Sequence, residues 1–405
     1  MKKVFALVTV LCLVLVGIII YQQQIQLKSK AAKTEVTEVI DSNEQDLQSS
    51  EKAETAEIKK INFDKIYSLH NPDEIVMAVN GEEITWQKYF HFFYDYAAQI
   101  ENYIATYSYY GMDISWDESF DGEKTFKELP GIYAEQDLKQ YATIEGMAKQ
   151  EGIELNEENK KAVGETIKNI IVESCGEEAT DEDFNQKLAE SYMSRELYTD
   201  LISNSYLYQQ LFIEKYGEGG ASLSDNEVID YLKKEGYICA DHILFSTVDR
   251  DTGETPSEDE LREKKETAER IIVELKGIED RKERYEKFLE YRDEYSEDAG
   301  KVTYPDGYTF TEGKMVTEFD EAARALEEYE ISEIVESTYG YHIIMKLPLS
   351  SDAIIEYSDN QTPITACAKC ANGKYGDALE KYMKNITVEY MQGFEIPVVT
   401  DYVEK

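Results

Sequence analysis

Residues 337–347 read STYGYHIIMKL and place His342, one of four histidines in the chain, at the start of an apolar run. Residues 239–245, CADHILF, do the same with His242. Both runs are short and rich in large or β-branched apolar residues, which is typical of buried strands. A buried imidazole needs a hydrogen-bond partner. Whether these two strands pair therefore decides both the fold and the use of the histidines.

The residues between the two strands predict a compact α+β module. Ser224 and Glu227 have the spacing of a capping box, which marks the start of a helix after the glycine-rich residues 217–220. After the first strand, amphipathic patterns predict helices at 257–277, 281–296 and 318–328. The strand that carries His342 then closes the module.

The preceding 150 residues predict a mainly helical domain. Asn80-Gly81 sits between alternating apolar residues, which is a strong hairpin signal, and helical patterns then continue to about residue 216. The first of these helices is crowded with aromatic residues. We expect them to be either core residues or a groove for unfolded chain segments.

The first 21 residues have a different character. After Lys2 and Lys3, residues 4–20 contain no charged side chain. This length approaches that of a membrane span, and no small-x-small cleavage site follows. We therefore expect a retained single-pass anchor with the bulk of the chain outside the cytoplasm. Cleavage of a signal peptide and secretion are the alternative.

These patterns together divide the chain into five expected regions. They are an anchor or signal at 1–21, a flexible linker at 22–60, a helical domain at 61–222, the α+β module at 223–350, and a C-terminal segment at 351–405 that returns to the helical domain.

Charge excludes one class of partner. The formal net charge is −41, from 83 acidic and 42 basic residues. No surplus of lysine or arginine is left to neutralise phosphates, so we expect no nucleic acid partner. The acidic surface either attracts basic clients and cations or is simply solvated.

The cysteines predict no metal site. Cys367 and Cys370 form a lone C-x-x-C without a second ligand pair nearby. We expect a local disulfide or a thiol pair in a loop, and no cofactor. His70 and His91 lie outside any ligand pattern and receive no role.

Several ordered blocks resemble the parvulin family of peptidyl-prolyl cis/trans isomerases. They are ADHIL at 240–244, YSED at 295–298, GKM at 313–315 followed by Phe319, and the stretch 330–344 that contains STYGYH. The surrounding plan resembles extracytoplasmic foldases of the PrsA/SurA type. The resemblance implies an α+β parvulin-like domain, a four-stranded antiparallel sheet with surrounding helices, inserted in or following a mainly helical chaperone domain behind the N-terminal membrane anchor.

The resemblance also implies which residues form the site. His242 and His342 would lie side by side on neighbouring strands, with Ser337 completing a hydrogen-bonded chain and Asp298 near the twisting carbonyl. We expect this group to act directly in catalysis or only to shape the sheet core.

The proline ring would need an apolar pocket. Met315 and Phe319, one helical turn apart, are its expected walls, with Leu244 or Phe310 added. Residues 300–315 depart from the Gly-Gly-Asp-Leu-Gly loop of many parvulins, so the leucine wall has no match here.

The expected function follows from the resemblance. Isomerisation of an X-Pro bond must cross a barrier of about 18–20 kcal/mol and needs no covalent step, only preferential binding of the twisted amide. We expect a membrane-anchored foldase that isomerises X-Pro bonds in unfolded or partly folded exported proteins and has chaperone activity. The alternatives are a holdase with a weak or inactive parvulin module, or an anchored scaffold. The resemblance leaves a homodimer open.

Overall fold

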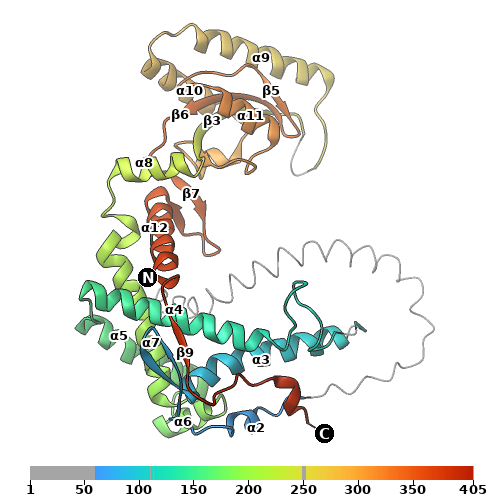
Figure 1. Cartoon of the computed structure of the whole chain (residues 1–405). Coiled ribbons are helices and arrows are strands. Elements are labelled where there is room, and N and C mark those ends of the chain that lie inside the picture. The colour runs from blue at the N-terminus through green and yellow to red at the C-terminus, as the bar shows by residue number, and fades with distance from the viewer. Residues whose placement is uncertain (1–59, 110, 113, 249–251, 405) are drawn as a thin grey trace, which may run out of the picture. The chain divides into compact units, whose positions relative to one another are not determined.

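The structure is a computed structural model that describes residues 60–404 except 110, 113 and 249–251 (Figure 1). The predicted anchor at 1–21 lies outside the described residues, as does the predicted linker up to residue 59. In the part of the chain that is described, no helix combines the length and the apolar character needed to cross a membrane.

The described chain forms two compact units. One contains the residues up to Leu211 together with those from Ala378 onward, and the other is Phe212–Asp377. Residues 353–371 belong to the second unit because they pack on α8 (Asp225–Lys234), where Val228, Leu232, Ala366 and Cys370 share one buried cluster.

The first unit is mainly helical. Its elements are α2 (Phe63–Tyr67), β1 (Ile75–Val79), β2 (Glu82–Thr85), α3 (Trp86–Tyr109), α4 (Leu129–Glu151), α5 (Glu157–Cys175), α6 (Asp181–Ala189), most of α7 (Arg195–Tyr216), β9 (Val388–Tyr390) and η3 (Val399–Tyr402).

A small sheet joins the two ends of the first unit. Asn80 and Gly81 have φ values of 55° and 82°, which suits the two-residue turn that the sequence predicts between β1 and β2. On its other edge β1 pairs with β9, so that Val79 lies opposite Val388. The sheet order is therefore β2-β1-β9, with the strand from near the C-terminus at one edge.

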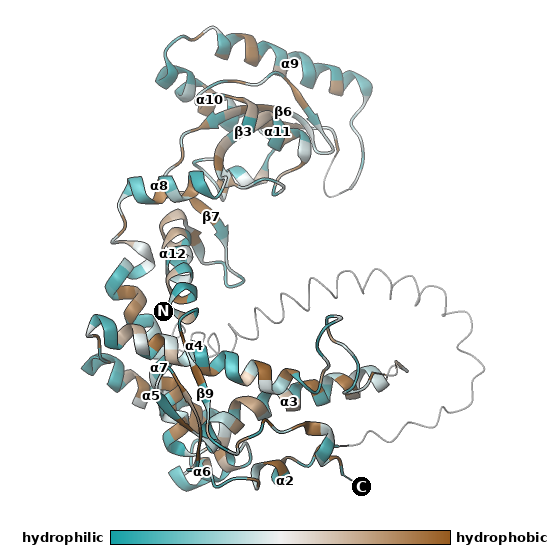
Figure 2. Ribbon diagram, in the orientation of Figure 1, coloured by the Kyte–Doolittle hydropathy of each residue, from teal (hydrophilic) through white to brown (hydrophobic). Residues whose placement is uncertain are grey.

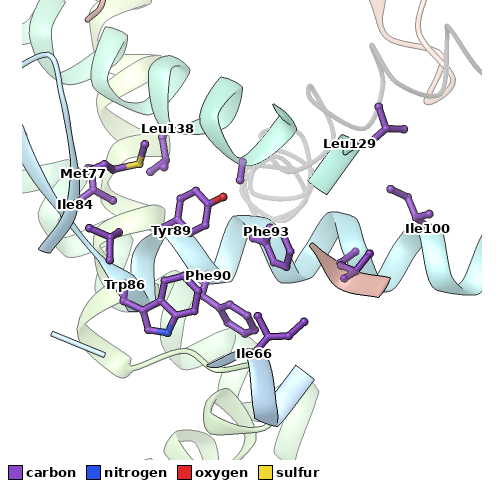
Figure 3. Close-up of a cluster of buried hydrophobic side chains, with 14 of the residues drawn as sticks. Ile66, Met77, Ile84, Trp86, Tyr89, Phe90, Phe93, Ile100, Leu129 and Leu138 are labelled. Atoms are coloured by element: carbon purple, nitrogen blue, oxygen red, sulfur yellow. The ribbon is translucent and has the colours of Figure 1, made fainter. Parts of the chain in front are cut away.

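The aromatic residues of α3 form much of the core of the first unit (Figure 3). Trp86, Tyr89, Phe90 and Phe93 are fully buried. Their rings contact one another at centroid distances of 5.2–6.2 Å, which is the range of favourable aromatic pairs. Of the two interpretations of these aromatics, core packing is the one that holds for these four residues.

The second unit is the α+β module. Its elements are η1 (Glu218–Gly220), α8 (Asp225–Lys234), β3 (Ile238–Ser246), α9 (Glu258–Lys276), α10 (Arg281–Tyr295), η2 (Ala299–Val302), β4 (Tyr308–Phe310), α11 (Thr317–Ala325), β5 (Val335–Ser337), β6 (Gly340–Leu347), β7 (Ile354–Tyr357), β8 (Pro363–Thr365) and most of α12 (Ala366–Met383).

A four-stranded antiparallel sheet organises this unit, as the resemblance implies. Its order is β4-β3-β6-β5, so the first and last long strands are central neighbours. Both strands are buried on both faces. Residues such as Ile243 and Ile343 face α9 and α10, whereas Ala240 and Ile344 belong to the cluster on the side of α11. Figure 2 shows the outer helix α9 as mostly hydrophilic, with apolar residues restricted to part of its surface.

Helix caps confirm the sequence signals. Ser224 and Glu227 form the predicted capping box at the start of α8, and Ser257 and Glu260 form another at the start of α9. Each box satisfies amide groups that the first turn of a helix leaves unpaired.

The prediction that Cys367 and Cys370 lie in a loop is wrong. Both are in the first turns of α12, because Thr365 accepts a hydrogen bond from the Ala368 amide and starts the helix early. Both are free cysteines, and burial raises the pKa of each thiol. A raised pKa is the opposite of what a reactive thiolate requires.

Gly340 provides a test of the central strand pair. It begins β6 with φ of 145°, and a Cβ atom there would lie 2.1 Å from the carbonyl oxygen of Phe245 on β3. Gly340→Ala should lower the free energy of unfolding by more than about 3 kcal/mol, because backbone strain and the clash add. Urea denaturation measures the change.

Gly236→Ala is the matched control. Gly236 has φ of 77° and open space where a Cβ would be, so only the backbone cost of about 1–2 kcal/mol applies. Equal losses for the two variants would show that close approach to β3 does not matter at Gly340.

Candidate active site

The two histidines of the paired strands form the centre of the candidate site. In the β3–β6 ladder His242 lies opposite Ile344 and Leu244 lies opposite His342, so the histidines are diagonal neighbours on one face. Their Nδ1 atoms are 2.9 Å apart, and the rings stack with centroids 5.1 Å apart. Their exposed fractions are 7% and 3%. The side-by-side placement expected from the resemblance is therefore present.

The pair continues into a longer hydrogen-bonded chain. On one side, Nε2 of His342 is 2.7 Å from the hydroxyl of Ser337. On the other, Nε2 of His242 is 3.2 Å from Oδ2 of Asp298, and the hydroxyl of Tyr308 donates to the same oxygen at 2.6 Å. The structure thus brings together all four residues predicted to be catalytic and adds Tyr308.

The chain of contacts has one consistent proton arrangement when both imidazoles are neutral. The ionised carboxylate of Asp298 only accepts, so Nε2 of His242 carries its proton and Nδ1 of His242 is an acceptor. Nδ1 of His342 then donates to it, and Nε2 of His342 accepts from the hydroxyl of Ser337. Every donor in the chain therefore points toward Asp298, and no tautomer is left undetermined.

Asp298 is held in its ionised form. Burial opposes the charge, but hydrogen bonds from His242 and Tyr308 outweigh it and keep the pKa of Asp298 well below its ordinary value. The amide of Gly300 also donates to Oδ1 at 3.2 Å. Both carboxylate oxygens are engaged, so this group can act through its field and is poorly placed for nucleophilic attack.

The segment before Asp298 is fixed to β3. The hydroxyl of Ser296 accepts a hydrogen bond from the amide of Leu244, and the amide of Glu297 donates to the carbonyl of Leu244. Lys264 binds both the Glu297 carboxylate and the carbonyl of Ser246. The YSED block of the sequence is therefore an extension of the sheet edge, which places Asp298 beside His242.

Apolar residues cover the imidazoles. The ring of Phe319 lies edge-on to His242 and His342 at centroid distances of 5.2 and 5.6 Å. Phe319 itself contacts Phe310 at 6.0 Å. This packing excludes water from the histidine pair and strengthens its hydrogen bonds.

The predicted pocket walls separate into two groups. Phe310 and Met315 line a cavity of about 310 Å³, whereas Leu244 and Phe319 are only 1% and 4% exposed and are not among its lining residues. The expectation that Met315 and Phe319 lie one helical turn apart is wrong. The helix α11 begins at Thr317, so Met315 precedes it in the loop.

Three residues near the site were missed in the sequence analysis. Asp241 and Arg292 form a buried ion pair at 2.6 Å, and Arg292 also donates to the carbonyl of Pro305 at 2.7 Å. This pair ties the 300–307 loop to β3. Asp241 carried a usable signal, because a carboxylate inside an apolar strand requires a buried cation.

Tyr308, the third missed residue, had no such signal. Tyr308 is the first residue of β4 and lies within residues 300–315, which depart from the family pattern. Its fit depends on Gly300. A Cβ on Gly300 would lie 1.8 Å from the Tyr308 hydroxyl oxygen. Among the residues that the structure describes, no group of three His, Cys, Asp or Glu side chains is arranged to hold a metal ion.

Comparison with known proteins defines the class first. Residues 242–347 match the model of the rotamase family, a PPIC-type PPIase domain. This region contains the whole histidine chain described above.

The relatives then define the family. The chain is 30% identical over 207 residues to foldase protein PrsA 4 of Bacillus cereus, a match that covers 44% of this chain and 69% of that protein. It is 36% identical over 143 residues to the PrsA foldase of Halalkalibacterium halodurans, covering 35% of this chain and 37% of the relative. For the PrsA foldase of Oceanobacillus iheyensis the identity is 28%, over 55% of this chain and 62% of the relative. The chain belongs to the PrsA foldase family, and its matches span less than two thirds of the latter two relatives.

Asp241→Asn tests the ion pair that anchors the loop. The substitution leaves the buried Arg292 guanidinium without its carboxylate partner, so we expect a loss of about 3–5 kcal/mol in the free energy of unfolding. Chemical denaturation measures it.

The second acidic partner of Arg292 supplies the control. Asp293 is 3.5 Å away and its side chain is 72% exposed, so Asp293→Asn should cost less than about 1 kcal/mol. A similar loss for both variants would contradict a special role for the buried pair.

Tyr308→Phe tests the hydrogen bond that keeps the pKa of Asp298 low. The variant removes one hydrogen bond to the carboxylate and should raise the pKa of Asp298 toward its ordinary value of about 3.9. A depressed pKa stabilises the fold above the ordinary value, and this stability is lost as the pH falls through the depressed pKa. The stability difference between parent and variant should therefore be about 1.5–3 kcal/mol at pH 7 and shrink below about pH 4.

Urea denaturation between pH 2 and 7 checks this dependence. Tyr304→Phe is the control, because the ring of Tyr304 contacts that of Tyr308 but no hydrogen bond joins Tyr304 to Asp298 in the described residues. Its difference from the parent should not vary with pH. A Tyr308→Phe difference that is equally flat would contradict the hydrogen bond.

Proposed function

We propose that this protein is an extracytoplasmic foldase that accelerates cis/trans isomerisation of X-Pro bonds in exported proteins and also has chaperone activity. The observation that carries the proposal is the hydrogen-bonded chain from Ser337 through His342 and His242 to Asp298, buried under Phe319. Membership of the PrsA foldase family and the match to a PPIC-type PPIase domain support it.

The proposed mechanism is non-covalent. A planar amide is stabilised by a resonance form with negative charge on oxygen, and twisting the C–N bond removes that form. An anion held near the carbonyl oxygen disfavours the planar amide more than the twisted one. In this proposal Asp298 supplies that field, and His242 and Tyr308 hold it ionised in a fixed position.

The remaining residues have supporting roles in the proposal. Ser337 and His342 fix the tautomer and orientation of His242, which makes them positioning residues. Met315 and Phe310 contact the proline ring, and Phe319 keeps water from the imidazoles. Leu244 is fully buried and supports the histidines from within the sheet. Removing water from the amide lowers the barrier, because the twisted amide is less polar than the planar one.

The proposal extends to the whole chain. The expected domain boundaries at 61–222, 223–350 and 351–405 stay predictions, with the helical part as the chaperone domain. The apolar residues 4–20 support a single-pass membrane anchor with the bulk outside the cytoplasm. A homodimer is a further prediction that size measurements in solution address.

Acceleration of isomerisation in a short X-Pro peptide tests the proposed function. The full chain, kept in a mild detergent because of its apolar N-terminal residues, should accelerate the reaction. Asp298→Ala and His342→Ala should each lower kcat/KM by roughly tenfold or more, which corresponds to about 1.4 kcal/mol of transition-state stabilisation. His70→Ala is the control, because His70 lies in the other unit and pairs with Glu74 there.

The outcomes separate the candidate functions. Equal rates for the parent and both site variants would remove these residues from the mechanism. A folded parent that does not accelerate the reaction but suppresses aggregation of an unfolded protein would leave the holdase as the function. Circular dichroism of each variant shows whether a loss of rate reflects a loss of fold.

A further inference from the structure

A cavity of about 310 Å³ lies next to the candidate site, within the unit Phe212–Asp377. One side is formed by the 304–315 region. The other is formed by residues outside the segment that matches the PPIase domain model, from before β3 and from β7 and α12. Its apolar walls are Tyr237, Tyr304, Tyr308, Phe310, Met315 and Ile355.

The cavity and the histidine chain share one wall. The hydroxyl of Tyr308 donates to Asp298, while its ring lines the cavity and contacts that of Tyr304 at a centroid distance of 4.9 Å. The ring of Tyr308 is 5.8 Å from that of His242. An extended chain advances about 3.3–3.6 Å per residue. In the proposed function the proline ring contacts Phe310 and Met315, which line this cavity, so the side chain about two residues from the proline reaches the opposite wall at Tyr237 and Ile355.

The hairpin of β7 and β8 holds the second wall in place. Tyr357 on β7 packs edge-on against Tyr304 at 5.8 Å, and its hydroxyl donates to the carbonyl of Thr303 at 3.3 Å. Ile355 also packs on the buried cluster of Val228 and Leu232. These contacts fix both walls of the cavity, so the cavity is part of the packed structure of this unit.

The size and lining of the cavity select a kind of occupant. Its volume is at the lower end for binding sites of small molecules, which suits one large side chain better than a folded segment. Aromatic and thioether walls favour an aromatic guest, because ring pairs and sulfur–ring contacts add to the burial of apolar surface.

The charges at the cavity disfavour a basic guest. Lys369 pairs with Glu356 at 2.8 Å, so these two charges offset each other. Lys314 also lines the cavity and makes no salt bridge with any residue that the structure describes. The lining therefore has a net positive charge, in a chain whose formal net charge is −41.

We propose that this cavity is a client subsite that binds a large apolar, preferentially aromatic, side chain about two residues from the isomerised proline. The subsite rests on the proposed isomerase function. It extends that function by giving the enzyme a sequence preference set by Tyr237 and Ile355, which lie outside the segment matched by the domain model.

A peptide panel tests the preference in the full chain. The peptides differ only at the position two residues before or two residues after the proline, where they carry Phe, Ala, Glu or Lys. At one of these positions the parent should show a kcat/KM for Phe about tenfold above that for Ala, the order expected for an apolar pocket. Lys should be the poorest residue at that position.

Two variants fill the cavity from its outer wall. Ile355→Trp and Lys369→Trp should each reduce the ratio of Phe to Ala to within about twofold, while turnover of the Ala peptide changes by less than about twofold. The Lys369 side chain on α12 is 38% exposed, so we expect this second variant to keep its fold even if the strand substitution does not.

Matched controls separate filling from other effects. Val273→Trp adds the same side chain at an α9 position that is 72% exposed and is not among the residues that line the cavity. Glu356→Gln removes the same ion pair as Lys369→Trp without filling the cavity. Both controls should keep the preference for Phe.

The results distinguish failure of the subsite from failure of the proposed function. Turnover of all peptides with equal kcat/KM overturns the subsite and leaves the isomerase intact. If no peptide is turned over, calorimetric binding of the Phe and Ala peptides decides the matter. Tighter binding of the Phe peptide that is lost in Ile355→Trp or Lys369→Trp supports the subsite, and equal binding overturns it.

Discussion

The pairing of β3 with β6 is the interaction on which the second unit depends. Eight residue pairs, from Cys239 opposite Leu347 to Ser246 opposite Gly340, fix the register. A slip by one residue would turn every side chain to the other face of the sheet. It would separate the two imidazoles and also move Ile243 and Ile343 out of the cluster under α9 and α10. Packing of the core and geometry of the site are therefore set by one ladder.

The hydrogen bonds that join Ser337, the two histidines and Asp298 all run in one direction. Each donor in this hydrogen-bonded series points toward Asp298, and the amide of Gly300 donates a further hydrogen bond to the carboxylate. A buried network of this kind is stabilising only when each member is satisfied. Removing one member leaves its neighbour with an unmade hydrogen bond in a region without water. The network that positions the carboxylate is therefore also part of what holds the loop at 300–308 in its conformation.

The sequence was most informative where the period of apolar residues was regular. The strands around His242 and His342, the hairpin at Asn80-Gly81 and the capping box at Ser224 all follow from local pattern. The strand pairing, the four-stranded sheet and the grouping of the four expected catalytic residues followed from the resemblance. Contacts that depend on the path of a loop could not be predicted. Tyr308 reaches Asp298 only because Gly300 has no side chain, and no periodicity encodes such a contact. The helical position of Cys367 was missed because one hydroxyl, that of Thr365, decides where α12 begins.

Because β9 lies near the C-terminus, the two units can complete their folds at different times during synthesis of the chain. The module Phe212–Asp377 is continuous in sequence, so all of its strands exist once residue 377 has been made. The first unit is not continuous. β1 is paired with β9, Ile61 bridges Val403, and the amide of Glu404 donates to the carbonyl of Lys60. Two strands cannot pair before both have been synthesised. During synthesis from the N-terminus, the unit Phe212–Asp377 can therefore fold completely before the first unit does. The helical unit, whose first strand appears more than 300 residues before its edge strand, closes last.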